Sequence, residues 1–393
     1  MAKGRQQVGY RTAKPQGLRT WPFVVAALVL CVAVGWCAVV KFSGTQGAEA
    51  SGETQAAQID ASAASVQIDG QPVDYEDPRA EVVIAGDLCF AEDGFVLDHF
   101  DEVGELDKCV SPEILDVTNG ADVFFLNHEY AISDRGEPLA GKYYTFRADP
   151  ERMDLLKQMG TDLVSLANNH VYDYGAEAML DTADLLDEAD IQYMGGGRNI
   201  DEAKRPVFFD INGIKVGFVG ASNAEKMRYT PQAEDDSPGV LLAYDTAEFN
   251  EVIEQASKEC DYLIAYIHWG DEDTNDYNDL QQQLGREFLE SGADIVVGGH
   301  PHVLQGMEYV DGKPIVYSLG DFWFNDETKF TGLLKLSIGR DGLKEMSFVP
   351  CMQEGFETHY LGDPDEQAEL FDFLEGLSPN VQIDDAGRIT ETA

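Results

Sequence analysis

The sequence has little cysteine, and its cysteines do not form a metal-binding pattern. The 393 residues include 6 cysteines, and none has the CxxC or Cys/His spacing of a zinc site. Two lie in a long apolar run, which leaves four for the rest of the chain: Cys89, Cys109, Cys260 and Cys351. If this part is exported, a disulfide is permitted, with Cys89–Cys109 the nearest pair in sequence, and buried free thiols are the alternative.

Positive charge is also scarce. The chain has 27 Lys and Arg against 72 Asp and Glu, which gives a formal net charge of -45. Because residues 1–41 contain six basic residues and no acidic one, residues 42–393 carry about -51. Such a surface repels nucleic acid and anionic lipid, so we expect no nucleic-acid partner. It attracts divalent cations, although solubility alone explains most of these charges.

One apolar run is long enough to cross a membrane. Residues 21–40, WPFVVAALVLCVAVGWCAVV, are uncharged over about the 20 residues that a bilayer requires, with a tryptophan near each end. A cleaved signal peptide would have a shorter apolar stretch and a small-residue cleavage site. We therefore predict a cytoplasmic basic segment at 1–20, a single transmembrane anchor at 21–40 and a globular part outside the cell membrane.

The remaining chain divides by composition. Residues 41–78 are rich in Ala, Ser, Gly and Gln and predict a flexible linker. Short apolar runs then alternate with helical patterns, which indicates an α/β domain at 79–330, completed by strands and a helix at 331–393. We expect strands at 81–87, 121–127, 162–168, 215–221, 261–270, 294–300, 314–322, 331–338 and 344–350. We expect helices at 150–159, 175–189, 246–258, 278–291 and 365–376.

Polar residues recur at the ends of the expected strands. Six lie at or just past a carboxyl end of a strand: Asp87, Asn127, Asn168, His268, His300 and Asp321. One such residue is uninformative, because a turn after a strand often begins with Asp or Asn. Six in one domain predict a site, because ligands of α/β proteins bind at the carboxyl edge of the sheet.

Histidines are the first candidates for metal ligands. His300 and His302 in GGHPH (298–302) flank a proline that fixes the backbone, so one loop presents two imidazoles. His268 follows a strand in IHWGDE (267–272), where Glu272 is expected to orient it. Five of the seven histidines lie in such blocks, which favours a shared site.

Oxygen ligands complete this set. In ANNHVYDYG (167–175), Asn169 can bind a metal through its carbonyl oxygen and His170 can act as a general acid. Asp173 either orients His170 or caps the following helix. Asp87 and Glu129 add carboxylates that can bridge two cations. A mixed set without cysteine favours two divalent ions, Mn, Fe or Zn, over Ca or Mg.

The order of these blocks resembles a known family. GDLCF, NHEY, ANNHVYDYG, IHWGDE and GGHPHVLQGMEYVDGKPIVYSLGDFWF resemble the bacterial capsule-synthesis CapA family, associated with poly-γ-glutamate capsules, over roughly residues 81–325. That family looks like a branch of the calcineurin-like metallophosphoesterases. The resemblance therefore implies a metallophosphoesterase-like two-sheet sandwich flanked by helices.

The resemblance also implies how the metals are shared. Asp87 and His302 would bind one metal. Asn169, His268 and His300 would bind the other.

Further residues receive roles from the same resemblance. Glu129 would bridge the two metals, and His170 would be the acid or the partner of a substrate oxyanion. Asn127 and Arg147 would lie on the substrate side, and a structural role for each is an equal alternative.

Four positions depart from the family pattern. The first block, DLC at 87–89, lacks the second-position His of phosphoesterases, so the first metal has one ligand fewer. His128 stands where the family usually has an apolar residue, and Gly299 where His is frequent. Asp321 replaces the usual Asn and adds a carboxylate close to the expected site.

Three functions follow from these observations. The first is an exported metal-dependent hydrolase of a phosphoester or of a γ-glutamyl amide in capsule polymer synthesis or export. The second is a non-catalytic subunit that binds an anionic polymer beside the membrane subunits of a capsule synthase. The third is an inert scaffold with a degenerate site. The missing His of the first block favours this function, whereas the presence of the other candidate ligands argues against it.

Overall fold

The computed structural model describes residues 67–68, 71–72, 77–92, 96–224 and 228–392. The chain divides into two units, Met1–Val73 and Asp74–Ala393. In the first unit, β1 (Gln67–Ile68) and β2 (Gln71–Pro72) form an antiparallel pair. The predicted anchor at 21–40 and nearly all of the predicted linker at 41–78 lie outside the described residues. No helix within the described ranges is long and apolar enough to span a membrane.

A ten-stranded sheet forms one half of the second unit. One end of it is four parallel strands: β3 (Ala80–Leu88), β4 (Val123–His128), β7 (Leu163–Ser165) and β8 (Gln192–Met194). On the other side of β3 the sheet continues antiparallel through β18 (Lys329–Gly339), β19 (Gly342–Glu354), β22 (Arg388–Glu391) and β21 (Val381–Ile383). Two short strands pair with β3 and β19: β17 (Asp321–Trp323) and β20 (Glu357–Tyr360).

A six-stranded sheet forms the other half. Its parallel strands are β11 (Ile214–Ser222), β13 (Tyr262–His268), β14 (Ile295–Gly299) and β16 (Lys313–Val316). Antiparallel strands close its edges: β10 (Val207–Ile211) and β15 (Met307–Val310). Two small sheets lie in the connections: β5 (Ala131–Ile132) with β6 (Arg147–Ala148), and β9 (Gly196–Gly197) with β12 (Gly239–Val240).

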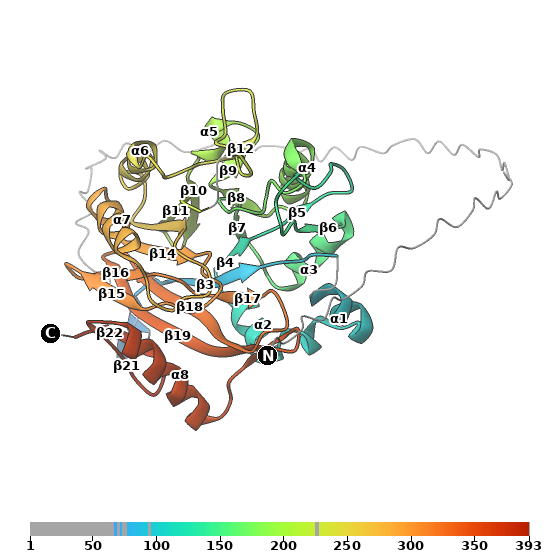
Figure 1. The fold of residues 1–393 in the computed structure, drawn as a ribbon. Coiled ribbons are helices and arrows are strands. Elements are labelled where there is room, and N and C mark those ends of the chain that lie inside the picture. Colours follow the sequence, from blue (N-terminus) through green and yellow to red (C-terminus); the bar gives the residue numbers. More distant parts are fainter. Residues whose placement is uncertain (1–66, 69–70, 73–76, 93–95, 225–227, 393) are drawn as a thin grey trace, which may run out of the picture. The chain divides into compact units, whose positions relative to one another are not determined.

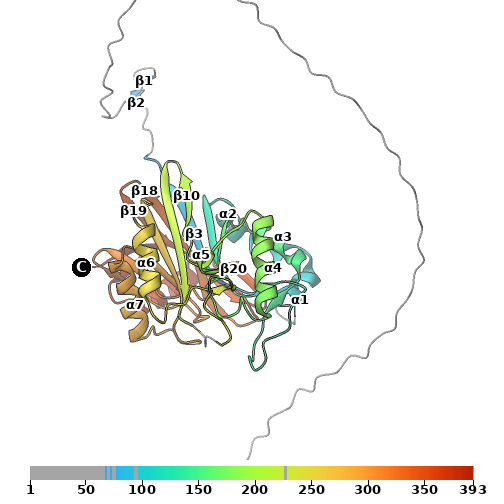
Figure 2. The same ribbon diagram turned by 90° about the horizontal axis from the view of Figure 1, so that it is seen from above.

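Helices cover the outer faces of both sheets. Outside the ten-stranded sheet lie α1 (Val96–Val103), α2 (Pro112–Asn119), α3 (Met153–Gln158) and α4 (Gly175–Glu188). Outside the six-stranded sheet lie α5 (Ile200–Ala203), α6 (Ala247–Ala256) and α7 (Asp279–Glu290). Figure 1 shows the arrangement, and Figure 2 shows α6 and α7 on the opposite side of the sheets from α3 and α4.

The core explains why this sandwich forms. Successive residues of β3 alternate between two clusters, with Val82 and Ile84 facing the six-stranded sheet and Val83 and Ala85 facing the helices. A strand that is buried on both faces has a continuous apolar sequence, and such apolar runs predicted these strands from the sequence. The inner cluster also takes in Leu370 of α8 (Pro364–Leu377), so the C-terminal helix is part of the core. The predicted α/β fold of two packed sheets flanked by helices is confirmed.

The prediction of a single strand at 314–322 was wrong. The segment forms two strands in different sheets, because β16 ends at Val316 and β17 begins at Asp321. The chain turns between them at Gly320, whose φ of 66° suits glycine. The consequence is that Asp321 lies opposite Asp87 of β3 rather than at the end of the six-stranded sheet.

The cysteines of the described residues are free thiols. Cys89, Cys109 and Cys351 are buried and Cys260 is partly buried. The alternative of buried thiols therefore holds, and the Cys89–Cys109 disulfide is not formed.

Candidate metal centre

The carboxyl ends of the parallel strands of both sheets bring the polar residues together. Asp87 lies near the end of β3, Glu129 directly follows β4, and Asn169 comes after β7. From the other sheet, His268 ends β13 and His300 directly follows β14. This is the crevice in which α/β proteins bind their ligands.

The GGHPH loop is held in an unusual backbone conformation. His300 and His302 have φ values of 97° and 58°, a region that non-glycine residues rarely adopt. Gly299 has no room for a side chain, because a Cβ there would lie 2.3 Å from the Tyr266 hydroxyl and 2.7 Å from Asp87 Oδ1. The backbone N–H of His300 donates to Asp87 Oδ2 at 2.9 Å. Such strain clusters at functional sites, where the surrounding structure enforces it.

Two buried carboxylates form the floor of the cluster. The Asn127 amide donates to Asp87 Oδ1 at 2.8 Å and to Glu129 Oε2 at 3.0 Å, which holds the two carboxylates side by side. Burial raises the pKa of Asp87 to about 7, and the charge of Glu129 adds to this effect. Burial likewise raises the pKa of Glu129 to about 7. Burial therefore disfavours the charged form of both carboxylates, and a bound cation would stabilise it.

Imidazoles and an amide face these carboxylates. His268 Nε2 lies 2.7 Å from Asn169 Oδ1 and 3.4 Å from Glu129 Oε1, and the His268 and His300 rings are 4.7 Å apart. Burial lowers the pKa of His268 to about 3 and holds the pKa of His300 well below its ordinary value, an effect that the neighbouring His268 strengthens. Both imidazoles are therefore neutral, the form that binds metals.

His302 lies between the carboxylates. Its Nδ1 is 2.8 Å from Asp321 Oδ1 and 3.7 Å from Asp87 Oδ2, and its Nε2 is 3.8 Å from Glu129 Oε1. Burial alone would lower the pKa of His302, but the charges of Asp321 and Glu129 outweigh it and raise the pKa to about 10. In the metal-free protein the protonated ring thus supplies a positive charge among the carboxylates.

The cluster fits a divalent metal. Three overlapping groups have ligand atoms within 4.8 Å of one another: Asp87, Glu129 and His268; Glu129, His300 and His302; and Asp87, His302 and Asp321. Glu129 Oε1 and His300 Nδ1 are buried and make no hydrogen bond to the described residues. Buried polar atoms without partners are rare, and a bound cation would satisfy both. The structure thus brings together all the residues predicted as metal ligands.

A second buried group lies beside this cluster. His170 Nδ1 is 2.6 Å from Asp173 Oδ2, and the Lys142 ammonium lies 2.7 Å from Asp173 Oδ1. Lys142 also donates to the carbonyl oxygen of Asn169, so it ties Asp173 to the turn that carries a candidate ligand. Burial lowers the pKa of His170 and the charge of Asp173 opposes this.

The Asp173 side chain points to His170 and not to the start of the helix that follows. Its carboxylate accepts a hydrogen bond from the backbone N–H of Phe146 at 2.7 Å and contacts His170, whereas the N-cap of α4 is Tyr174. Asp173 thus orients His170 and does not cap the helix.

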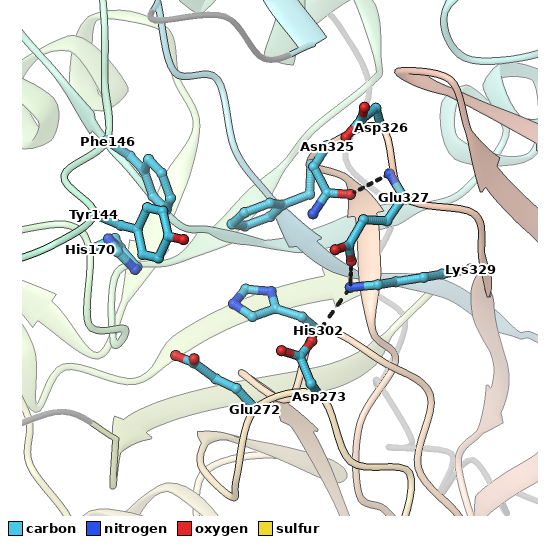
Figure 3. A pocket seen from close by; sticks show the side chains of 11 residues that line it. Tyr144, Phe146, His170, Glu272, Asp273, His302, Asn325, Asp326, Glu327 and Lys329 are labelled. Carbon is cyan, nitrogen blue, oxygen red and sulfur yellow. Dashed lines mark hydrogen bonds and ion pairs between the residues drawn. The ribbon is translucent and has the colours of Figure 1, made fainter. Parts of the chain in front are cut away.

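A pocket of about 290 Å³ opens next to His170 and His302. Figure 3 shows Tyr144, Phe146 and His170 on one side and Glu272 and Asp273 on another. The remaining wall is Phe324 together with residues 325–327 and Lys329, so the rim is mostly acidic and aromatic.

Two predicted substrate-side residues have structural contacts. Asn127 is fully buried between the carboxylates of Asp87 and Glu129. Arg147 donates to the carbonyl oxygens of residues 135 and 136 and lies over the Tyr174 ring at 4.1 Å. Neither is among the residues that line the pocket.

Sequence reasoning missed the side chains of the 142–146 segment. Lys142, Tyr144 and Phe146 reach the site from a connection without regular structure, between β5 and β6. The run GKYYTFR would have been the signal, because three aromatic residues and a lysine are unusual in an exposed loop. Lys329 was missed because it lies at the start of a strand far along the chain.

A known protein family matches most of the second unit. Residues 82–326, more than half of the chain, match the family described as "Bacterial capsule synthesis protein PGA_cap". The chain belongs to this family. The resemblance to the capsule-synthesis CapA family inferred from the sequence is thereby confirmed.

Curated relatives of this PGA_cap protein are similar over part of their length. It is 33% identical over 215 residues to the PGA biosynthesis protein CapA of Bacillus subtilis (strain 168), which covers 54% of this chain and 56% of that protein. It is 32% identical over 225 residues to the capsule biosynthesis protein CapA of Bacillus anthracis, with 55% and 54% covered. The chain thus spans about half the length of the curated relatives it matches.

Solved structures are more distant. A hypothetical protein from Thermus thermophilus matches with a TM-score of 0.44 and 16% identity, covering 70% of this chain and 99% of that one. A putative 5'-nucleotidase from Staphylococcus aureus matches with a TM-score of 0.39 and 14% identity, covering 76% and 58%.

Proposed function

We propose that this PGA_cap protein is a metal-dependent hydrolase that acts on a phosphoester or a γ-glutamyl amide during synthesis or export of a poly-γ-glutamate capsule. One observation carries the proposal: unpartnered buried ligand atoms at the carboxyl ends of two sheets, beside a His–Asp pair and an open pocket. The names of the Bacillus relatives, PGA biosynthesis protein and capsule biosynthesis protein, support the choice of polymer.

The residues divide into two positions for divalent ions, Mn, Zn or Fe. Asp87 and His302 would hold one ion, Asn169, His268 and His300 the other, and Glu129 both. Ions held there would supply an activated water molecule and would polarise a phosphoryl or carbonyl oxygen.

Side chains of the protein would supply the proton donor and the wall of the substrate pocket. Asp173 fixes the His170 ring through Nδ1, and its charge favours the protonated ring, which would donate its Nε2 proton to the leaving oxygen or nitrogen. Tyr144 and Phe324 form the aromatic part of the pocket wall, against which the uncharged part of a substrate could pack.

The hydrolase proposal is tested with the unit that begins at Asp74. Purified residues 74–393 should hydrolyse a generic phosphodiester or poly-γ-glutamate once Mn or Zn is added. The double variant His300→Ala/His302→Ala should lose this activity, because each cation position then loses one imidazole ligand. His99→Ala on α1, which contacts Glu357 outside the site, is the matched control. Activity that survives in the double variant would refute the proposal.

We further propose that residues 21–40 anchor the protein with its globular part outside the cell. The five basic residues before this run support that orientation. The full-length chain should stay with membranes in alkaline carbonate, and its globular part should be digested by protease added to intact spheroplasts. A chain lacking residues 1–40 that is still membrane-bound would contradict the anchor.

A polymer-binding subunit without catalysis is the second candidate. The acidic pocket rim favours it, since an anionic polymer could approach Glu272, Asp273 and residues 326–327 only with cations between them. Retention of intact poly-γ-glutamate on the immobilised protein only with a divalent cation, and co-purification with membrane synthase subunits, would support this role. A normal capsule in cells that lack the protein would count against it.

A further inference from the structure

The first cation position is one side chain short. It shares Glu129 and has only Asp87 and His302 of its own, and the next candidate ligand along the chain is Cys89. Its side chain is fully buried in the core cluster under the helices, together with Phe90 and Leu126. Cys89 therefore does not supply the missing ligand, and another residue must do so if this position is to hold an ion firmly.

A neighbouring strand brings a carboxylate to this position. β17 pairs in parallel with β3, and the register places Asp321 opposite Asp87. The backbone N–H of Asp87 donates to the carbonyl oxygen of Gly320 at 2.8 Å, which fixes the two strands at this point. Asp321 is only 1% exposed, so the sheet holds its carboxylate inside the cluster.

The contacts of Asp321 leave it capacity for a cation. Its Oδ1 is 2.8 Å from His302 Nδ1. Its Oδ2 lies 3.5 Å from both Asn325 Nδ2 and Lys329 Nζ, the limit of a hydrogen bond. Lys329 is held more closely by Glu327, at 2.5 Å. Oδ1 thus has one close partner, whereas Oδ2 has only distant ones, so Oδ2 keeps lone pairs that a cation could use.

We propose that Asp321 is the missing ligand, so that Asp87, Asp321, His302 and the shared Glu129 form the first cation position. This inference rests on the metal centre of the proposed function and deepens it. The first position then has three carboxylates and one imidazole, whereas the second has two imidazoles, one amide and the shared carboxylate.

The two positions consequently differ in metal preference. Carboxylates suit hard cations such as Mn²⁺ and Mg²⁺, whereas imidazoles suit Zn²⁺ and Fe²⁺. The preference for Zn²⁺ over Mn²⁺ is therefore smaller at the first position. With both metals present, Zn²⁺ fills the second position first and Mn²⁺ competes best at the first.

Metal stoichiometry of the full-length protein in detergent tests this assignment. After chelation and reloading with Mn²⁺ alone, the wild type should hold two ions per chain by elemental analysis, and spin coupling should appear in its Mn²⁺ electron paramagnetic resonance spectrum. Asp321→Asn should hold one ion, without coupling. Asp87→Asn should lose the same ion. Asp273→Asn is the matched control, because Asp273 also contacts Lys329, at 3.8 Å, but lies exposed at the pocket rim.

The competing role for Asp321 is to orient His302 alone. An asparagine oxygen would still accept a hydrogen bond from His302 Nδ1, so Asp321→Asn would then keep two coupled ions, with affinity lowered by about 10-fold to 100-fold. That result overturns the proposal. One ion in both the wild type and Asp321→Asn also overturns it, while leaving the rest of the metal centre intact. No ion in the wild type refutes the proposed function itself, and this inference with it.

Discussion

Asp173 is the buried carboxylate on which a lysine, a histidine and a backbone amide converge. The Lys142 side chain is 5% exposed and the Asp173 side chain is fully buried, so removing the ammonium leaves a carboxylate that neither water nor another cation can reach. Its value to the site lies in fixing the His170 ring and the Asn169 turn together.

Replacement of Lys142 should therefore cost much more than replacement of a surface lysine. We expect Lys142→Met to lower the free energy of unfolding by about 3–5 kcal/mol in urea titration, because one partner of a buried ion pair is lost. Lys157→Met is the control: Lys157 is 47% exposed and 3.9 Å from Asp154, and we expect a change within about 0.5 kcal/mol. Equal effects would show that the pair is not buried in solution.

His128 gives a test of pH dependence. Its ring is fully buried against Tyr130, neither ring nitrogen makes a hydrogen bond to the described residues, and burial lowers its pKa to about 3. The imidazole stays neutral in the folded chain but binds a proton in the unfolded chain below its ordinary value of 6.5. Stability is therefore lost as the pH falls from 6.5 toward 3.

His128→Leu should remove this loss. We expect the substitution to raise the free energy of unfolding by about 2 kcal/mol more at about pH 5 than at about pH 7.5, measured in urea. His128→Gln, which also cannot titrate but keeps a polar group, should flatten the pH dependence to the same degree at lower overall stability. The same gain from leucine at both pH values would mean that His128 does not titrate in this way.

At the scale of residues, sequence spacing found the side chains that cluster at the strand ends but not their partners. Asp87, His268 and His300 could be predicted because each ends an apolar run, and strand ends converge in an α/β fold. The contact of Lys142 with Asp173 could not, because a connection without regular structure carries no periodicity that says which way its side chains point.

At the scale of elements, the close approach of β17 to β3 depends on Gly86. A Cβ on Gly86 would lie 1.9 Å from the carbonyl oxygen of Gly320, an atom of the backbone that no change of rotamer can move. Alanine at this position must therefore push β17 away from β3, and Asp321 away from Asp87.

Gly86→Ala should thus damage both stability and metal binding. We expect a loss of about 3 kcal/mol in the free energy of unfolding and a weaker first cation position in Mn²⁺ titration. Gly362→Ala is the control, because a Cβ there meets no atom within 4 Å and we expect little effect on either quantity. A Gly86→Ala protein with normal stability would mean that the two strands are not in contact in solution.

The split of the predicted strand 314–322 shows what element patterns cannot say. The residues of β16 and β17 are equally apolar, and the segment reads as one run in the sequence. Which sheet each half joins is decided by its partner strand, β14 for β16 and β3 for β17, and β3 lies more than 200 residues before β17. Local periodicity holds no information about such pairing.

At the scale of the whole molecule, the large negative net charge affects stability. With about -51 on residues 42–393, self-repulsion opposes the compact state, and salt should relieve it. Raising NaCl from about 20 mM to about 200 mM shortens the screening length to below about 10 Å. We expect the Tm of chelator-treated residues 74–393 to rise by about 2–4 °C, measured by circular dichroism.

A matched salt separates screening from sodium binding. Choline chloride at the same ionic strength should give the same rise, because screening depends on ionic strength and not on the identity of the cation. A Tm that is unchanged or lower in both salts would contradict the repulsion argument.

The pairing of β17 with β3 also determines when, during folding, the residues of the site come together. Its ligands are spread from Asp87 to Asp321, and the two farthest apart in sequence are neighbours across paired strands. Contacts between distant parts of a chain form late and slowly, because the intervening loop must be closed first. A chain that emerges N-terminus first gathers these groups only when nearly all of it is available, so an ion bound by them would be captured after folding and would not nucleate it.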